Sequence, residues 1–100
     1  MFYILWEFKV ALKHRSEFEE AYKGDGVWAR LFGRDPAYVK TILLRNKEDE
    51  TRYVTIDAWK DRQAHADFKN MFAVDYSRID KECELLTQSE RVIGIYEEIV

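Results

Sequence analysis

TRYVTIDAWKDRQAHADF, residues 51–68, decides the fold, because within it the pattern changes from that of a β-strand to that of a helix. Side chains alternate between the two faces of a strand. One face is aromatic and polar and the other is apolar: Thr51, Tyr53, Thr55, Asp57 and Trp59 against Val54, Ile56 and Ala58. The segment predicts a strand that runs directly into a helix.

The helical half of this stretch has a defined start and an apolar stripe. Asp61 occupies the position of an N-cap, where a carboxylate can accept a hydrogen bond from a free backbone N–H. Ala64, Phe68 and Phe72 then recur at intervals of four, which is the spacing of one helix face. We expect the helix to continue to about Leu86, with a kink at 74–75.

Outward from this stretch, the chain alternates between strand and helix patterns. Ser16 and Glu19 have the spacing of a capping box at the start of the first helix. The predicted elements, in order, are a strand at 2–10, a helix from Ser16, a short helix at 27–32, strands at 37–45 and 51–60, the helix from Asp61, and a strand at 91–99.

This order predicts one α+β domain over residues 1–100, with a ferredoxin-like βαββαβ fold. Both helices would cover one face of an antiparallel sheet. The uncovered face is expected to carry Tyr3, Leu5, Tyr53 and Trp59. Because a monomer rarely leaves such a face in water, we expect a homodimer whose two sheets form a dimeric α+β barrel.

Composition narrows the possible functions. Sixteen basic and 19 acidic residues give a net charge of −3, which argues against a nucleic-acid partner. No apolar run is long enough to span a membrane, and the first residues lack the features of a signal peptide, so a cytoplasmic location is expected. The lone Cys83 predicts neither a disulfide nor a metal site. Aromatic residues make up 15% of the chain, which favours an aromatic pocket or interface.

From Asp57 to Phe72 the sequence resembles the antibiotic biosynthesis monooxygenase family of the dimeric α+β barrel superfamily. The matching pattern is an acidic residue, a strand-end aromatic, a helix cap and an alanine: Asp57, Trp59, Asp61 and Ala64. The resemblance implies a homodimer with a cavity between sheet and helices. It also implies oxidation of quinols or polyketide aromatics without a metal or flavin, and a related branch degrades haem.

The chain departs from the family pattern at the position nine residues after Trp59. Quinol-oxidising members often have histidine there, haem-degrading members have tryptophan, and this chain has Phe68. The haem-degrading type also has an asparagine on its first strand and a ligating histidine further along the helix; here the first strand has no asparagine, and Arg78 is near the ligand position. Haem degradation by that mechanism is therefore not expected, and no cofactor or metal is expected.

The candidate catalytic residues are His65 and Asp57. A neutral imidazole at His65 could take a proton from a phenol, and Asp57 could orient it if both point into one cavity. For each, an ordinary structural role is the alternative: a surface or cap-proximal histidine, and an aspartate that bonds an interface or a helix end. Candidate substrate-binding residues are Trp6, Phe8, Trp28, Phe32, Phe68, Phe72 and Tyr76, with plain core packing as the alternative for the phenylalanines of the long helix.

Two functions are favoured by the sequence, and a third, a lactone isomerase or decarboxylase on the same fold, also stays open. The first is a cofactor-independent monooxygenase that acts on a small phenolic or quinol substrate. The second is a non-catalytic dimeric barrel that binds a small aromatic molecule or a protein. The missing family histidine at Phe68 favours the second, whereas an aromatic cavity suits both.

Overall fold

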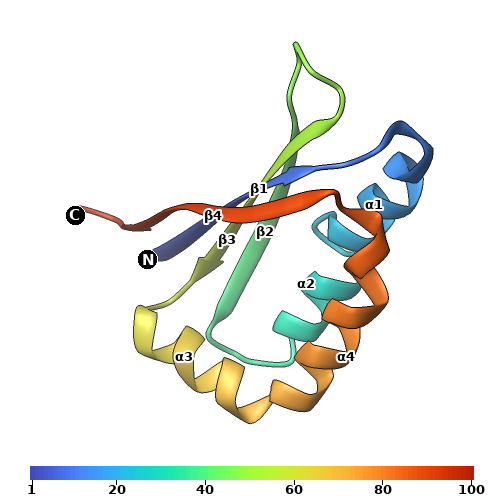
Figure 1. Cartoon of the computed structure of the whole chain (residues 1–100). Helices are drawn as coiled ribbons and strands as arrows, with labels where there is room; N and C mark the ends of the chain where they lie inside the picture. The colour runs from blue at the N-terminus through green and yellow to red at the C-terminus, as the bar shows by residue number, and fades with distance from the viewer.

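The computed structural model describes all 100 residues, and it confirms the ferredoxin-like α+β fold. Four antiparallel strands form one sheet in the order β2-β3-β1-β4. All helices lie on one side of this sheet and leave the other side uncovered (Figure 1). The elements are β1 (Phe2–Lys9), η1 (Leu12–His14), α1 (Arg15–Tyr22), α2 (Val27–Phe32), β2 (Tyr38–Arg45), β3 (Arg52–Trp59), α3 (Arg62–Met71), α4 (Ala73–Cys83), η2 (Glu84–Leu86) and β4 (Ser89–Glu97).

The junction between β3 and α3 forms as the sequence predicts. Trp59 ends the strand, and the carboxylate of Asp61 accepts a hydrogen bond from the backbone N–H of Ala64 at 2.8 Å. This contact satisfies one of the backbone donors that a helix start leaves without a partner. The strand therefore passes into the helix with only two residues between them.

The predicted capping box at Ser16 is wrong. The helix α1 already begins at Arg15, no side chain caps it, and Ser16 lies in its first turn. Glu19 is used elsewhere, because its carboxylate accepts a hydrogen bond from the hydroxyl of Tyr53 and lies 3.2 Å from the guanidinium of Arg45. The 3₁₀ turn η1 directly precedes α1, so helical backbone begins at Leu12, earlier than the spacing of Ser16 and Glu19 indicated.

The long helix after Asp61 does break, but the break is at Phe72 and not at 74–75. The backbone of Phe72 has φ −107° and ψ 26°, outside helical values, and separates α3 from α4. Its ring stacks on that of Phe68 at 5.0 Å between centroids, and the guanidinium of Arg34 lies 4.8 Å from its centre. These contacts hold the bend without a proline or glycine.

The aromatic and polar face of β3 is turned towards the helices, which corrects the predicted composition of the uncovered face. Tyr53 and Trp59 are each only 1% exposed. The register explains this, because Trp59 pairs with Phe2 and Tyr53 with Phe8, both of which belong to the core face of β1. The uncovered face instead carries an apolar set: Tyr3, Leu5, Ile42, Leu44, Val54, Ile56 and Ile93.

This orientation of β3 places polar side chains inside the protein. Thr55 and Asp57 lie between the two buried aromatics of the strand and are themselves buried. Thr41 of β2 pairs with Asp57 and is buried as well. Burying such groups costs free energy unless they are hydrogen-bonded, and the hydroxyl of Thr41 donates a hydrogen bond to Asp57. None of the helices has both the length and the apolar character that a membrane-spanning segment needs.

Candidate active-site cavity

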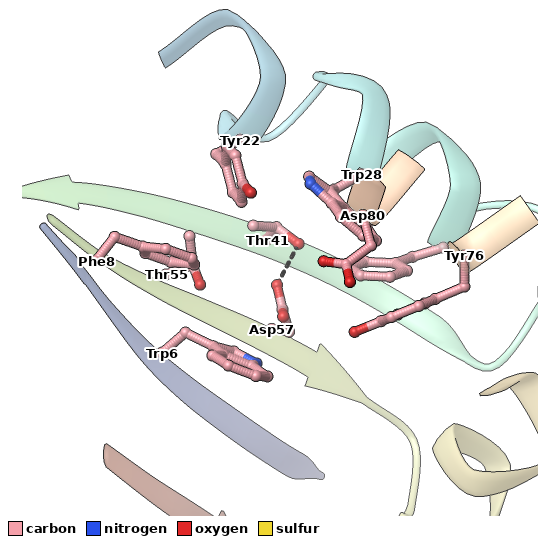
Figure 2. Close-up of a pocket in the computed structure, with 10 residues that line it drawn as sticks. Trp6, Phe8, Tyr22, Trp28, Thr41, Thr55, Asp57, Tyr76 and Asp80 are labelled. Atoms are coloured by element: carbon pink, nitrogen blue, oxygen red, sulfur yellow. Dashed lines mark hydrogen bonds between the residues drawn. The ribbon is translucent and has the colours of Figure 1, made fainter. Parts of the chain in front are cut away.

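A cavity lies between the helix-facing side of the sheet and the helices α1, α2 and α4 (Figure 2). It is partly open to solvent and has a volume of about 50 Å³, enough for about four water molecules or the edge of one aromatic ring. The residues around it are mostly aromatic: Trp6, Phe8, Tyr22, Trp28, Phe32, Thr41, Thr55, Asp57, Tyr76 and Asp80.

Asp57 is the buried ionisable group of this cavity. One of its carboxyl oxygens, Oδ1, accepts a hydrogen bond from the hydroxyl of Thr41 at 2.7 Å. That hydroxyl in turn accepts one from the hydroxyl of Tyr38 at 2.7 Å, so the chain of donors fixes the carboxyl group in place. The other oxygen, Oδ2, has no protein partner, and Figure 2 shows the carboxyl group directed into the space between the walls.

Burial changes the acidity of Asp57. Removal from water raises the pKa of this carboxyl from 3.8 to about 6, although the hydrogen bond from Thr41 acts in the opposite direction. The group is therefore ionised at neutral pH and has a pKa close to the range in which a carboxylate works as a base.

The walls of the cavity are aromatic rings in edge-on, tilted and stacked contact. Trp28 and Tyr76 meet edge to face with 5.0 Å between centroids, and Trp6 lies 6.3 Å from Phe8. The indole N–H of Trp28 is buried near Tyr22 and Cys83 and makes no well-aligned hydrogen bond. Burial raises the pKa of Tyr76 to about 12, so its hydroxyl stays protonated. The cavity thus offers flat apolar surfaces with an N–H donor, a hydroxyl and a carboxylate.

The structure brings one of the two predicted catalytic residues to the cavity and leaves the other outside. Asp57 lines it, whereas His65 does not. The imidazole of His65 packs against Trp59 and Phe2, with 5.2 Å and 6.1 Å between ring centroids. Burial, and then the charge of Lys69, lowers the pKa of His65 to about 4. The two residues therefore do not share one cavity, as the sequence-based hypothesis required.

Of the predicted substrate-binding residues, some line the cavity and others lie outside it. Phe68 and Phe72 do not line the cavity. Phe68 is fully buried against Trp59 and Phe32, at 5.0 Å and 5.5 Å between centroids, which is ordinary core packing. The other five line the cavity: Trp6, Phe8, Trp28, Phe32 and Tyr76.

Four further lining residues escaped the sequence analysis. Thr55 and Thr41 could have been found from the polar face of β3 and the residue opposite it, once that face is placed inward. Tyr22 and Asp80 come from helices, and only the packing of α1 and α4 against the sheet brings them to the cavity. No three side chains of the metal-binding types lie close enough together to hold a metal ion.

Comparison with known proteins gives one family and one fold. The family model of antibiotic biosynthesis monooxygenases matches residues 1–73. Among solved structures, a proposed antibiotic biosynthesis monooxygenase from Bordetella bronchiseptica superposes with a TM-score of 0.78 at 20% identity, covering 99% of this chain and 97% of that chain. SnoaB from Streptomyces nogalater, described as a cofactor-independent oxygenase, superposes with a TM-score of 0.72 at 20% identity, covering 99% and 93%.

A third solved structure, a proposed antibiotic biosynthesis monooxygenase from Nitrosomonas europaea, has a TM-score of 0.73 at 19% identity and covers 100% of both chains. At such identities the structural likeness concerns the fold alone. No curated protein matches the sequence at a significant level.

Proposed function

Because the chain belongs to the antibiotic biosynthesis monooxygenase family, we propose that it oxidises a small one-ring phenol or quinol with dioxygen, without a cofactor, in the aromatic cavity. The observation that carries this proposal is the carboxylate of Asp57, which is buried among aromatic rings with one oxygen held by Thr41 and the other free. The enclosed volume of about 50 Å³ admits only the edge of one ring, so the rest of the substrate would lie at the open side, and a single ring is favoured over a fused polycycle.

In the proposed reaction Asp57 is the proton acceptor. Its Oδ2 takes the proton of the substrate hydroxyl, and the phenolate then transfers an electron to dioxygen. The resulting radical pair forms a bond between a ring carbon and oxygen, which gives a peroxide. Loss of water from the peroxide, using the proton returned by Asp57 and the hydrogen of that ring carbon, leaves a carbonyl. One oxygen atom enters the product, the other leaves as water, and the four electrons lost by the ring reduce the dioxygen.

The acidity of Asp57 makes the first step feasible. A phenol with a pKa of about 10 gives its proton to a carboxylate with a pKa of about 6 at a cost of about 5 kcal/mol. A turnover of about one per second corresponds to a total barrier of about 17 kcal/mol. The proton transfer therefore uses less than a third of that barrier.

Oxygen consumption tests this proposal. Purified protein treated with a chelator is mixed with hydroquinone, resorcinol or 4-methylphenol in an oxygen electrode, and the rate without protein is subtracted. We expect uptake that rises with pH and levels off above the pKa of Asp57, about 6. Asp57→Asn should lose at least about 100-fold in rate, which is typical of removing a general base. Absence of uptake above the blank for every phenol would refute the proposal.

The matched control is His65→Gln. His65 is the other candidate base, but its ring packs on Trp59 and Phe2 outside the cavity. We therefore expect its oxygen uptake to stay within about twofold of the parent protein. A loss as large as that of Asp57→Asn would return the role of base to His65.

The uncovered sheet face supports a second part of the proposal, a homodimer. Ile42 and Leu44 on β2 are 37% and 47% exposed, and they lie beside Ile56 and Val54 of β3 on an apolar surface. A second copy related by a twofold axis presents the same apolar surface and can cover it. This arrangement joins the two sheets and leaves each cavity on the far, helix-covered side.

Sedimentation velocity tests the dimer. We expect the mass of two chains for the parent protein and of one chain for Ile56→Lys, because the added ammonium would have to be buried in the interface. Leu85→Lys is the control, since Leu85 is 82% exposed on η2, away from the sheet. A parent protein that sediments as one chain at micromolar concentration would refute the dimer.

A further inference from the structure

The two ionisable carboxyl groups that line the cavity carry charge of one sign. Its lining contains the carboxylates Asp57 and Asp80 and no lysine, arginine or histidine. Glu90 adds a third carboxylate nearby, because it pairs across the sheet with the lining residue Phe8. Burial and the charge of Asp80 raise the pKa of Glu90, as expected for carboxylates that lie close together.

Asp80 differs from the other acidic residues of its helix. Asp75 is 3.1 Å from the guanidinium of Arg34, and Glu82 is 3.3 Å from that of Arg78. Asp80 makes no ion pair and no hydrogen bond, although it lies on the same helix α4. In Figure 2 its carboxyl group lies next to Tyr76 and Trp28 and faces the interior of the cavity.

Two side chains of the cavity have a polar atom without a well-formed hydrogen bond. Asp57 is only 8% exposed, and its Oδ2 has no donor within the protein, although this oxygen is not closed off from solvent. Trp28 is 7% exposed, and its indole N–H lies near Tyr22 and Cys83 without a well-aligned hydrogen bond. The free oxygen of Asp57 can therefore accept a hydrogen bond from a ligand, in addition to the acidic surroundings.

The aromatic walls add to the attraction for positive charge. The faces of Trp6, Trp28 and Tyr76 carry negative electrostatic potential, and cations bind to such faces. The protein already shows this contact on one wall, where the ammonium of Lys69 lies 5.1 Å from the centre of the Tyr76 ring. Lys69 does not line the cavity, so it leaves the carboxylates inside without a counter-ion.

We propose that the cavity selects a one-ring phenol that carries a protonated amine. One edge of the ring lies among Trp6, Trp28 and Tyr76 with the hydroxyl facing Asp57, and the rest of the ligand, with its ammonium, lies at the open side on Asp80. This inference deepens the proposed function and rests on it for the position of the hydroxyl, but the preference for positive charge can be measured without turnover. The same charges disfavour phenols that carry a carboxylate.

Three phenols of similar size separate charge from shape: tyramine, 4-propylphenol and 4-hydroxyphenylacetate. Their dissociation constants are measured by isothermal titration calorimetry at pH 7.5 and low ionic strength, where interactions between charges are little screened. We expect tyramine to bind about tenfold more tightly than 4-propylphenol, because one partly exposed ion pair gives up to about fivefold and the nearby carboxylates add to it. The anion 4-hydroxyphenylacetate should bind most weakly.

Asp80→Asn removes the charge at the cavity with little change in shape, on an exposed position of α4. Its affinity for tyramine should fall about fivefold, while that for 4-propylphenol stays the same. Glu82→Gln is the matched control, since it removes one charge from the same helix outside the cavity and should leave both affinities unchanged. Equal affinities for the three phenols, tightest binding of the anion, or no binding of any would each overturn the inference.

Oxygen uptake with the same ligands separates this inference from the proposed function. Selective binding of tyramine without oxygen uptake from any phenol would refute the monooxygenase and leave the charge preference standing. Oxygen uptake that is equally efficient with all three phenols would refute the charge preference and leave the monooxygenase standing.

Discussion

Replacing Asp57 by asparagine should stabilise the protein at neutral pH, and by an amount that depends on pH. Burial raises the pKa of this carboxyl from 3.8 to about 6, so the folded protein favours the protonated form. The contribution of Asp57 to stability is complete below pH 4 and is lost as the pH rises through 6. A shift of about two units corresponds to about 3 kcal/mol of unfolding free energy.

Asparagine keeps the shape of the side chain and the acceptor for the Thr41 hydroxyl, which now donates to Asp57 Oδ1 at 2.7 Å. At pH 4 the parent residue is protonated, and the two proteins should have nearly the same stability. At pH 8 the asparagine avoids the cost of a buried charge, and we expect the variant to be more stable by about 2 to 3 kcal/mol. In urea this corresponds to a midpoint higher by about 1 to 2 M.

The assay is urea unfolding of both proteins, followed by tryptophan fluorescence, at pH 4, 6 and 8 and at one fixed protein concentration. His65 contributes a slope of opposite sign in the same range, because its pKa is lowered to about 4 and its protonation destabilises the fold as the pH falls. The difference between variant and parent cancels that slope. A difference that stays constant from pH 4 to pH 8 would refute the burial of an ionised Asp57. The expected gain in stability also means that loss of activity in this variant cannot be attributed to unfolding.

Three further predictions concern the surroundings of the site and the core. Thr41→Val removes the donor to Asp57, so the pKa of that carboxyl should rise further and the pH profile of oxygen uptake should move to higher pH; an unchanged profile would contradict the role of this hydrogen bond. Phe68→Ala leaves a cavity at a fully buried position between Trp59 and Phe32 and should cost about 3 to 5 kcal/mol in urea unfolding, whereas a loss below about 1 kcal/mol would contradict its core role. Asp61→Ala removes the cap of α3 and should cost about 1 kcal/mol in the same assay. Asp67→Ala is the control, because it removes a carboxylate from the middle of α3 without removing the cap.

Most of the fold could be predicted from the sequence, because periodicity identifies strands and helices when their apolar faces are regular. The stretch from Thr51 to Phe68 shows both periods in succession, and the N-cap at Asp61 fixes the boundary between them. The short helix α2 and the four strands follow the same rule. Details that depend on tertiary contacts were not predictable: Glu19 leaves its expected cap for Tyr53, and the helix bends at Phe72 beside Arg34.

The candidate site could be predicted only in part, because alternation shows that a strand has two faces but does not show which one is buried. Val54 and Ile56 are the more apolar set, and for that reason the face that carries Asp57 was expected to point away from the helices. In the structure Trp59 pairs with Phe2, which belongs to the core face of β1, so the face of β3 that carries Asp57 points towards the helices. Cavity residues from helices, such as Asp80, are determined by how α4 packs on the sheet, and no local pattern encodes that.

In β3 the odd-numbered side chains face the helices and the even-numbered side chains face the uncovered side of the sheet. Evolution therefore constrains the two sets of positions separately. Side chains at odd positions, such as Thr55 and Asp57, line the cavity. Side chains at even positions, such as Val54 and Ile56, form part of the surface on the other side of the sheet. Under the proposed function and the proposed dimer, point substitutions would change the preferred substrate and the association of copies independently of each other. Insertion or deletion of one residue inside β3 has no such freedom, because it would exchange the two sets and disrupt both properties at once. Homologues should thus differ in length in the loops around β3 and keep the spacing between Tyr53 and Trp59 constant.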